Sequence, residues 1–315
     1  MPNIPHSLPT GTRLDNYIIR KTLGGGGFSV VYLAEEVDTG RTAAIKEYMP
    51  GKLAVRADDL TVRASSGDAQ DRFQRGRNLF FQEASTLAAL RHPNIVEVRT
   101  FFNANGTVYM AMAYEEGKNL QHYISARKGR LSERFLLTVF PPLLDALRLI
   151  HDQGYLHLDI KPGNIHVRPG GSPLLLDFGA VHRRRASRQQ QLGQVTSAGF
   201  SPIEQYNRTG YVGPWTDIYA IGASMRACIE GRPPLDARER NSRDALRPAG
   251  EAFRRQYSAP LLEAMDWALE VDPLLRPQNV DDLLQALPRL EPEEAGDDVA
   301  AGLLERLAAM TRDRS

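Results

Sequence analysis

The sequence contains a single cysteine, Cys228, among 315 residues. One thiol can form neither an intramolecular disulfide nor a metal site of several cysteines, and we therefore expect a reducing compartment. The sequence also lacks an excess of charge of either sign, because its 39 Lys and Arg residues nearly balance its 38 Asp and Glu residues. This balance argues against a nucleic-acid or membrane-surface binder. No apolar run approaches the ~18 residues of a membrane span, and residues 1–10 lack the apolar core of a signal peptide.

The first third of the chain has the composition of short strands. Residues 17–47 are rich in Tyr, Ile, Val and Thr around a glycine cluster. Residues 48–78 are polar and predict a long surface loop, and the residue spacing that follows predicts a helix over 78–90. Strands are expected at 95–102 and 107–113, joined through Asn-Gly as a hairpin.

The remainder is mainly helical in pattern. Helices are predicted at 120–127, 132–151, 217–230, 260–270 and 280–287. Two consecutive prolines at 141 and 142 should break the second helix, which leaves only 143–151 as a firm expectation. The expected organisation is an N-terminal extension (1–12), a β-rich lobe (13–114), a helical lobe (115–290) and an acidic, then amphipathic tail (291–315).

A glycine-rich segment and a lysine suggest a phosphate site. Residues 23–32 place four glycines between two strands, where backbone N–H groups can approach phosphate oxygens closely. A dinucleotide fold would need a helix next and a glycine at Ser29, so we disfavour it. Lys46 lies in the next strand, and Glu83 on the helix face is a candidate partner. Taken alone, the glycine segment also fits a flexible turn, Lys46 a lysine of an edge strand, and Glu83 a partly exposed helix glutamate.

The segment 157–164, H-L-D-I-K-P-G-N, is followed by D-F-G at 177–179. The glycine loop, Lys46 and Glu83 precede these two motifs. They are followed by S-P-I-E at 201–204, W-T-D-I-Y-A-I-G at 215–222 and Arg276. In this order, the motifs resemble those of the eukaryotic-like (Hanks-type) Ser/Thr protein kinases. The similarity covers roughly residues 12–290, and the residues within the later motifs resemble those of bacterial members of the family. It implies an α+β, bilobal kinase fold, with a small antiparallel sheet and one main helix before a larger, mainly helical lobe.

The resemblance also implies roles for individual residues. ATP and Mg²⁺, or Mn²⁺ in its place, would be the cofactors, and protein Ser/Thr hydroxyls, the kinase's own included, would be the acceptors. Lys46, oriented by Glu83, would hold the α- and β-phosphates. Asp177 and Asn164 would hold the metal ions. Asp159 would accept the hydroxyl proton, and Lys161 would neutralise the γ-phosphate. The other implied nucleotide contacts are Leu23, Gly24, Gly26, Phe28, Val31, Ala44, Met112, Tyr114, Glu115, Asn119 and His166.

Further positions of the family pattern concern support and regulation. Glu204 and Arg276 would form a buried pair, and a spine would contain Leu87, Val98, His157, Phe178 and Asp217. Leu158 replaces the arginine that usually receives an activation-segment phosphate, so we expect activity to depend little on such a phosphate. His166 stands at an aliphatic position, where an imidazole can stack on a purine. Candidate regulatory residues are Ser187, Thr196 and Ser197, although the basic run before Ser187 also fits a solvated loop.

Two other functions share parts of this pattern. A pseudokinase scaffold would bind nucleotide without efficient transfer, and a small-molecule kinase would act on an aminoglycoside or choline. A pseudokinase is disfavoured because the sequence has all five of the residues Lys46, Glu83, Asp159, Asn164 and Asp177. A small-molecule kinase is disfavoured by the S-P-x-E segment. The resemblance further implies a cytoplasmic enzyme whose partners are protein substrates with Ser or Thr and a metal-dependent protein phosphatase, and the balanced charge argues against nucleic acid. The long separation of Lys46 and Glu83 predicts an insertion, which is either a tolerated loop or a docking surface.

Overall fold

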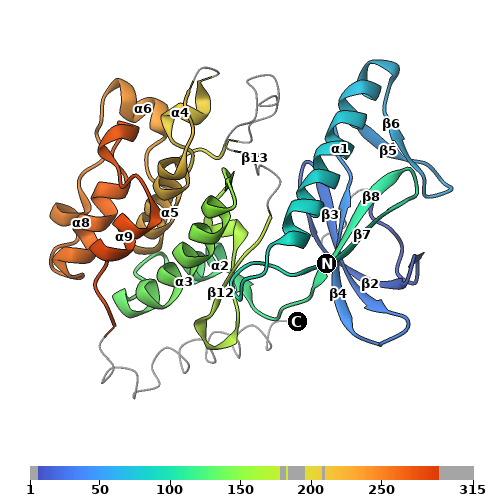
Figure 1. Cartoon of the computed structure of the whole chain (residues 1–315), viewed down its shortest axis with the longest axis horizontal. Coiled ribbons are helices and arrows are strands. Elements are labelled where there is room, and N and C mark those ends of the chain that lie inside the picture. The colour runs from blue at the N-terminus through green and yellow to red at the C-terminus, as the bar shows by residue number, and fades with distance from the viewer. Residues whose placement is uncertain (1–5, 178–181, 184–195, 208–209, 291–315) are drawn as a thin grey trace. The chain divides into compact units, whose positions relative to one another are not determined.

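The computed structural model describes residues 6–177, 182–183, 196–207 and 210–290. The chain divides into two compact units, Met1–Arg91 with Val96–Glu115 and His92–Ile95 with Glu116–Ser315. The second crossing, after Glu115, lies one residue from the expected lobe boundary, whereas the short excursion His92–Ile95 into the second unit was not expected. The architecture of each unit confirms the predicted α+β class (Figure 1).

Unit 1 is built on an antiparallel sheet with strand order β1-β2-β3-β4-β8-β7. Alternating Val, Ile, Tyr and Ala side chains fill its buried face, which is the packing that β-branched and aromatic residues favour. The Asn105-Gly106 turn joins β7 to β8, as expected, with φ positive at both residues. The strands are β1 (Arg13–Leu14), β2 (Tyr17–Gly25), β3 (Ser29–Glu36), β4 (Thr42–Tyr48), β7 (Val98–Ala104) and β8 (Thr107–Ala113).

The insertion after β4 is ordered, and the prediction of a surface loop over 48–78 was wrong. It contains a hairpin of β5 (Ala54–Arg56) and β6 (Val62–Ala64), followed by helix α1 (Gly67–Ala89). The helix begins eleven residues before the predicted start, at the N-cap Ser66, whose hydroxyl accepts a hydrogen bond from the Ala69 N–H. The first turns of the helix are mostly polar, so the sequence showed no helical periodicity there, although Ala69 and Phe73 are apolar and buried.

Unit 2 is mainly helical. Its helices are α2 (Leu120–Arg127), α3 (Glu133–Asp152), α4 (Ile203–Tyr206), α5 (Pro214–Glu230), α6 (Ala237–Ser242), α7 (Ala249–Ala252), α8 (Ala259–Ala268) and α9 (Val280–Ala286). Unit 2 also contains short strands, one before α2 and four between α3 and α4. Strands β9 (Lys118–Asn119), β11 (Ile165–Val167) and β12 (Pro173–Leu175) form one sheet, and β10 (Tyr155–Leu156) pairs with β13 (His182–Arg183). Single turns of 3₁₀-helix lie at Pro162–Asn164, Pro169–Gly171 and Pro273–Leu275.

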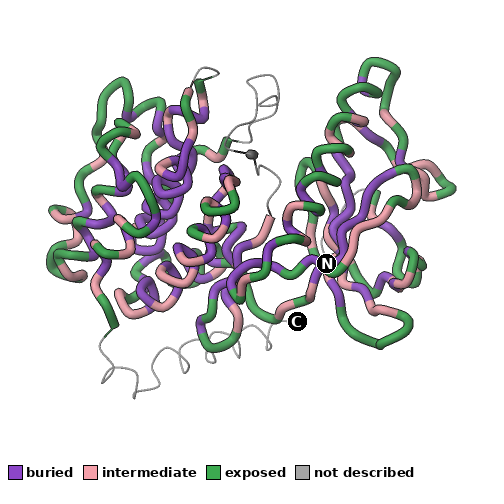
Figure 2. The backbone as a smooth tube through the Cα atoms, viewed as in Figure 1, coloured by how far each residue is buried: buried purple, intermediate pink, exposed green. Residues whose placement is uncertain are grey.

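Helices α3 and α5 form the core of unit 2. Helix α5 is buried along almost its whole length (Figure 2), including Cys228, as its apolar sequence predicts. Helix α3 continues through Pro141 and Pro142, so the predicted break was wrong. Each proline removes one backbone hydrogen bond, but ten buried side chains, Phe140, Leu143 and Leu144 among them, hold the helix in place.

Candidate active site

In unit 1 the structure pairs Lys46 with Glu83. Strand β4 places Lys46 on the sheet face covered by α1, and its Nζ lies 3.1 Å from Glu83 Oε1. Both side chains are buried, with 8% and 7% of their surface exposed, so each charge depends on the other. The Nζ also lies 5.4 Å from the centre of the Phe80 ring, one turn before Glu83. The lysine is therefore held at a fixed position by α1.

The candidate adenine contacts of unit 1 share the face of Lys46. Val31 lies opposite Lys46 in the β3–β4 register, and Ala44 lies two residues before Lys46 and opposite Met112 of β8. Residues directly opposite in a sheet point to the same side, so these four side chains form one surface. Tyr114 and Glu115 follow β8 at the end of unit 1, the first exposed and the second half-buried.

The glycine loop leaves its inner surface open. A Cβ built on Gly24 or Gly26 meets no atom within 4 Å, which leaves space beside the backbone N–H groups. Leu23 and Phe28 on either side expose 38% and 62% of their surface. The loop is tied to the start of the insertion, because Met49 N–H donates to the Phe28 carbonyl at 2.9 Å and Gly51 N–H to the Gly27 carbonyl at 3.2 Å.

In unit 2 three polar side chains contact the Asp159 carboxylate. Lys161 Nζ lies 2.9 and 2.8 Å from its two oxygens, and Asn164 Nδ2 donates to Oδ2 at 3.0 Å. The Ser197 hydroxyl donates to Oδ1 at 3.0 Å and also lies 3.2 Å from Lys161 Nζ. The structure thus brings an alcohol, a carboxylate and an ammonium group together.

Asp217 of α5 holds the backbone of this loop. Its carboxylate accepts the N–H groups of His157 and Leu158 at 2.9 and 2.8 Å, and a contact of 2.8 Å from His151 Nε2. Burial alone would raise the pKa of Asp217, but hydrogen bonding and charge from His151, with His157, lower it. Leu158 has a positive φ of 60°, a strained conformation that this double anchor supports.

Sequence reasoning missed two residues that support the loop. His151, on α3, contacts Asp217, and Gln205 of α4 donates from Nε2 to the Leu158 carbonyl at 2.8 Å. His151 lies in none of the quoted motifs and Gln205 directly follows S-P-I-E, and no local signal pairs them with positions 66 and 47 residues away. Leu158, which stands where the family pattern has an arginine, packs against Leu156 and Val212. An apolar contact therefore replaces a charged one at this position.

Asn164 and Asp177 offer oxygen ligands next to each other in the fold. Strands β11 and β12 pair Ile165 with Leu175, and the Leu176 N–H donates to the Asn164 carbonyl at 2.9 Å. Asn164 Nδ2 donates to both the carbonyl and the carboxylate of Asp159, so its side-chain oxygen is the group left to accept. A carboxylate and an amide oxygen suit Mg²⁺, and these residues fit the predicted metal.

The remaining predicted site residues have other contacts in unit 2. Asn119 caps α2 by accepting from His122 N–H at 3.0 Å, and its backbone pairs with His166 across β9 and β11. His166 Nε2 lies 3.1 Å from the Glu116 carbonyl oxygen. Thr196 is exposed. Phe178 and Ser187 lie outside the described residues.

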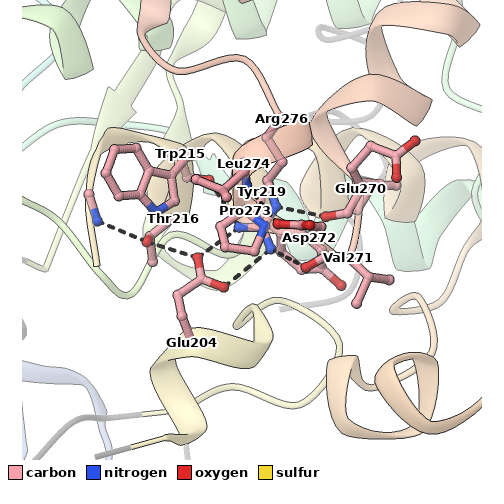
Figure 3. A network of polar contacts seen from close by, with 12 residues as sticks. Glu204, Trp215, Thr216, Tyr219, Glu270, Val271, Asp272, Pro273, Leu274 and Arg276 are labelled. Atoms are coloured by element: carbon pink, nitrogen blue, oxygen red, sulfur yellow. Dashed lines mark hydrogen bonds and ion pairs between the residues drawn. The ribbon is translucent and has the colours of Figure 1, made fainter. Parts of the chain in front are cut away.

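Glu204 and Arg276 form the pair that the sequence suggested (Figure 3). The Arg276 guanidinium donates to both carboxylate oxygens at 2.7 and 3.2 Å, and the Thr216 hydroxyl donates to the same carboxylate at 3.0 Å. Three carbonyls accept the other Arg276 hydrogen bonds, and the Tyr219 ring lies 4.8 Å below the guanidinium. This network fixes α4, and with it Gln205, which holds the loop that carries Asp159.

Comparison with known proteins agrees with this geometry. The family profile described as "Protein kinase domain" matches residues 17–292. The chain is 30% identical over 220 residues to serine/threonine-protein kinase PrkC of Bacillus subtilis (70% of this chain, 31% of that protein). It is 31% identical over 241 residues to the probable serine/threonine-protein kinase PknB of Bifidobacterium longum (73% and 32%). The chain spans less than half the length of these curated relatives.

Among solved structures, one described as the PpkA-294 apo form superimposes with a TM-score of 0.81 at 38% sequence identity, covering 90% of this chain and 100% of that one. In the part of the chain that the structure describes, no helix is long and apolar enough to cross a bilayer. The ordered motifs, the α+β architecture and the matched profile give one conclusion: the chain belongs to the protein kinase domain family and has the protein kinase fold.

Proposed function

We propose that the chain transfers the γ-phosphoryl group of Mg-ATP to serine and threonine hydroxyls of proteins, including its own. Unit 1 would supply Lys46 for the α- and β-phosphates, and unit 2 would supply the group that accepts the hydroxyl proton. The hydroxyl oxygen attacks the γ-phosphorus, the bond to the β-phosphate oxygen breaks, and the proton passes to the Asp159 carboxylate. Lys161 would balance the charge of the transferred group.

The observation that carries this proposal is the arrangement at Asp159. A serine hydroxyl donates to its Oδ1 at 3.0 Å while the Lys161 ammonium group lies 3.2 Å from the same hydroxyl oxygen. A proton acceptor within hydrogen-bond reach of an alcohol is what a phosphoryl transfer to an alcohol requires. The Ser197 contact supports the proposal because it shows that Asp159 can accept a hydrogen bond from an alcohol.

Asn164 and Asp177 would hold the Mg²⁺ ion. When bound, the ion would neutralise phosphate charge during the transfer. The protein's own contribution is to direct the Asn164 amide oxygen away from Asp159, since both N–H groups of that amide donate to Asp159. An Asn164→Asp variant would lose these two hydrogen bonds and place a second carboxylate beside Asp159, so we expect it to displace the Asp159 carboxylate and slow the phosphoryl transfer.

Incubation of the purified chain with labelled Mg-ATP, alone and with casein as a protein acceptor, tests the proposal. We expect label on both proteins and phosphoserine or phosphothreonine after hydrolysis. Asp159→Asn should abolish the label. Asp152→Asn is the matched control, because it makes the same change at an exposed aspartate at the end of α3 and should leave the transfer intact.

The same experiment separates the alternatives. Binding of Mg-ATP without labelled protein in either sample would assign a pseudokinase scaffold and overturn the proposal. Label on an added aminoglycoside or choline, with none on protein, would assign a small-molecule kinase. Label that survives in Asp159→Asn would come from a contaminating kinase.

A further inference from the structure

The insertion between β4 and α1 contacts the elements that carry Lys46 and Glu83. It leaves β4 two residues after Lys46, forms the β5–β6 hairpin and ends at Ser66, the N-cap of α1. Figure 1 shows the hairpin lying alongside the first turns of α1. Since α1 carries Glu83, anything that fixes the rotation of this helix also fixes the ion pair with Lys46.

One contact joins the hairpin to β4 through a buried charge. Arg56 Nη2 lies 2.6 Å from Glu47 Oε2, and these side chains expose 5% and 0% of their surface. Glu47 also accepts the hydroxyls of Tyr32 and Tyr109. Burial alone would lower the pKa of Arg56, but the hydrogen bond and charge of Glu47 raise it, so the guanidinium keeps its charge. The hairpin is thus anchored directly beside Lys46, from the opposite face of β4.

A second contact joins β4 to α1 through aromatic rings. Tyr48 lies two residues after Lys46 and therefore on the same strand face. Its ring lies 5.6 Å from that of Phe73 and 5.9 Å from that of Phe80. Phe73 and Phe80 share the buried face of α1 with Glu83. The Lys46–Glu83 pair and the Tyr48 stack therefore join the same strand face to the same helix face.

Gly76 permits this close approach. A Cβ at this position would lie 2.0 Å from Tyr48 Oη and 2.8 Å from Cζ. A glycine inside a helix is destabilising by about 1 kcal/mol relative to alanine, so an unobstructed helix would favour alanine here. The tyrosine ring occupies the space that a side chain would need, and this explains the glycine.

A third set of contacts joins the hairpin and α1 to the β7–β8 turn. Val62 N–H donates to the Asn105 carbonyl at 2.7 Å, and Arg77 of α1 donates to the Gly106 carbonyl at 3.3 Å. The Thr107 hydroxyl donates to the Tyr48 carbonyl at 2.6 Å. The helix is therefore fixed at its first turns, at Gly76–Arg77 and at Phe80, all before Glu83.

From these contacts we infer that Tyr48, Gly76 and the inserted hairpin are positioning residues: they form a built-in clamp that holds α1 in the rotation at which Glu83 pairs with Lys46. The contacts that form the clamp come from the chain's own residues. This inference rests on the proposed function, because the pair matters for catalysis only if the chain transfers phosphate. It gives the insertion a role other than the tolerated loop or docking surface considered from the sequence.

The test compares two glycine-to-alanine changes in the same helix. Gly76→Ala places a methyl group against Tyr48, whereas Gly67→Ala adds the same group at an exposed first-turn position with no atom within 4 Å. Hydrogen exchange of the α1 amides, the rate at which an acylating reagent modifies Lys46, and kcat and KM for ATP and casein are measured for both variants. The first two measurements do not require activity.

For Gly76→Ala we expect about tenfold faster exchange in α1 and faster modification of Lys46. We expect kcat/KM for ATP to fall about tenfold, which equals about 1.4 kcal/mol of transition-state stabilisation. KM for casein should stay unchanged, because the clamp lies in unit 1 and the acceptor group Asp159 in unit 2. Gly67→Ala should match the wild type. Tyr48→Phe added to Gly76→Ala removes the shortest contact and should restore part of each value.

Two results would overturn the clamp: equal behaviour of Gly76→Ala and Gly67→Ala, or faster α1 exchange with no change at Lys46 or in kcat/KM for ATP. If Gly76→Ala unfolds unit 1 altogether, Tyr48→Leu decides, since it removes the ring stack without adding volume; unchanged α1 exchange and Lys46 modification would then refute the clamp. A wild-type chain without transfer activity would defeat the proposed function, while the exchange and acylation data would still judge the clamp.

Discussion

Replacement of Arg276 by methionine should destabilise unit 2 severely. Arg276 is 2% exposed, and its guanidinium donates to both oxygens of Glu204 and to three backbone carbonyls, those of Glu270, Trp215 and Val271. Arg276→Met keeps much of the aliphatic volume but leaves a buried carboxylate with only the Thr216 hydroxyl as a described partner. Breaking one side of a buried pair in this way costs about 3–5 kcal/mol.

The measurement is urea unfolding followed by tryptophan fluorescence. Both tryptophans of the chain, Trp215 and Trp267, lie in unit 2, so the signal reports this unit. Trp215 also accepts a hydrogen bond from Arg276 through its carbonyl. We expect the free energy of unfolding to fall by about 3–5 kcal/mol, with a melting temperature about 10 °C lower.

The matched control is Arg148→Met. Arg148 bridges Asp145 and Asp281 on the surface, and all three side chains are about half exposed. Solvent screening limits such a pair to about 0–1 kcal/mol. Glu204→Gln combined with Arg276→Met removes the unpaired charge, so the double variant should be more stable than the sum of the single effects predicts. A loss below about 1 kcal/mol for Arg276→Met would refute the reasoning.

Three further predictions concern titration, reactivity and regulation. Burial lowers the pKa of His157 below its ordinary 6.5, so the unfolded state binds its proton more tightly. The stability of unit 2 should therefore be complete above about pH 6.5 and fall towards pH 5.5, by at most about 1.4 kcal/mol per pH unit; constant stability in urea titrations, or a fall that persists in His157→Gln, would contradict this. Burial in α5 also raises the pKa of the Cys228 thiol, and dithionitrobenzoate should label it only as unit 2 unfolds; rapid labelling of folded protein would disprove inertness. Because Leu158 packs against Leu156 and Val212 where an arginine was expected, phosphatase treatment or Thr196→Ala should leave kcat/KM within about twofold. An inactive Thr196→Ala restored by Thr196→Glu would show that a phosphate is needed after all.

Local signals in the sequence were sufficient for elements whose pattern is self-contained. Helix α2 and strand β8 occupy the predicted residues 120–127 and 107–113, because caps, turn residues and apolar periodicity act over a few positions. Ordered motifs were sufficient for the family, since phosphoryl transfer needs particular groups at particular spacings. The resemblance to this family, and no local signal, suggested that Glu204 pairs with Arg276.

Tertiary packing decided what local patterns could not. Pro141 and Pro142 stay within α3 because burial of the helix outweighs two missing backbone hydrogen bonds. Arg56 became the partner of Glu47, and Tyr48 became the neighbour of Gly76, only once the chain had folded back on itself. A buried carboxylate needs a cationic partner, but many Lys and Arg residues of a sequence could be that partner. Only the three-dimensional path of the chain determines which of them lies beside it.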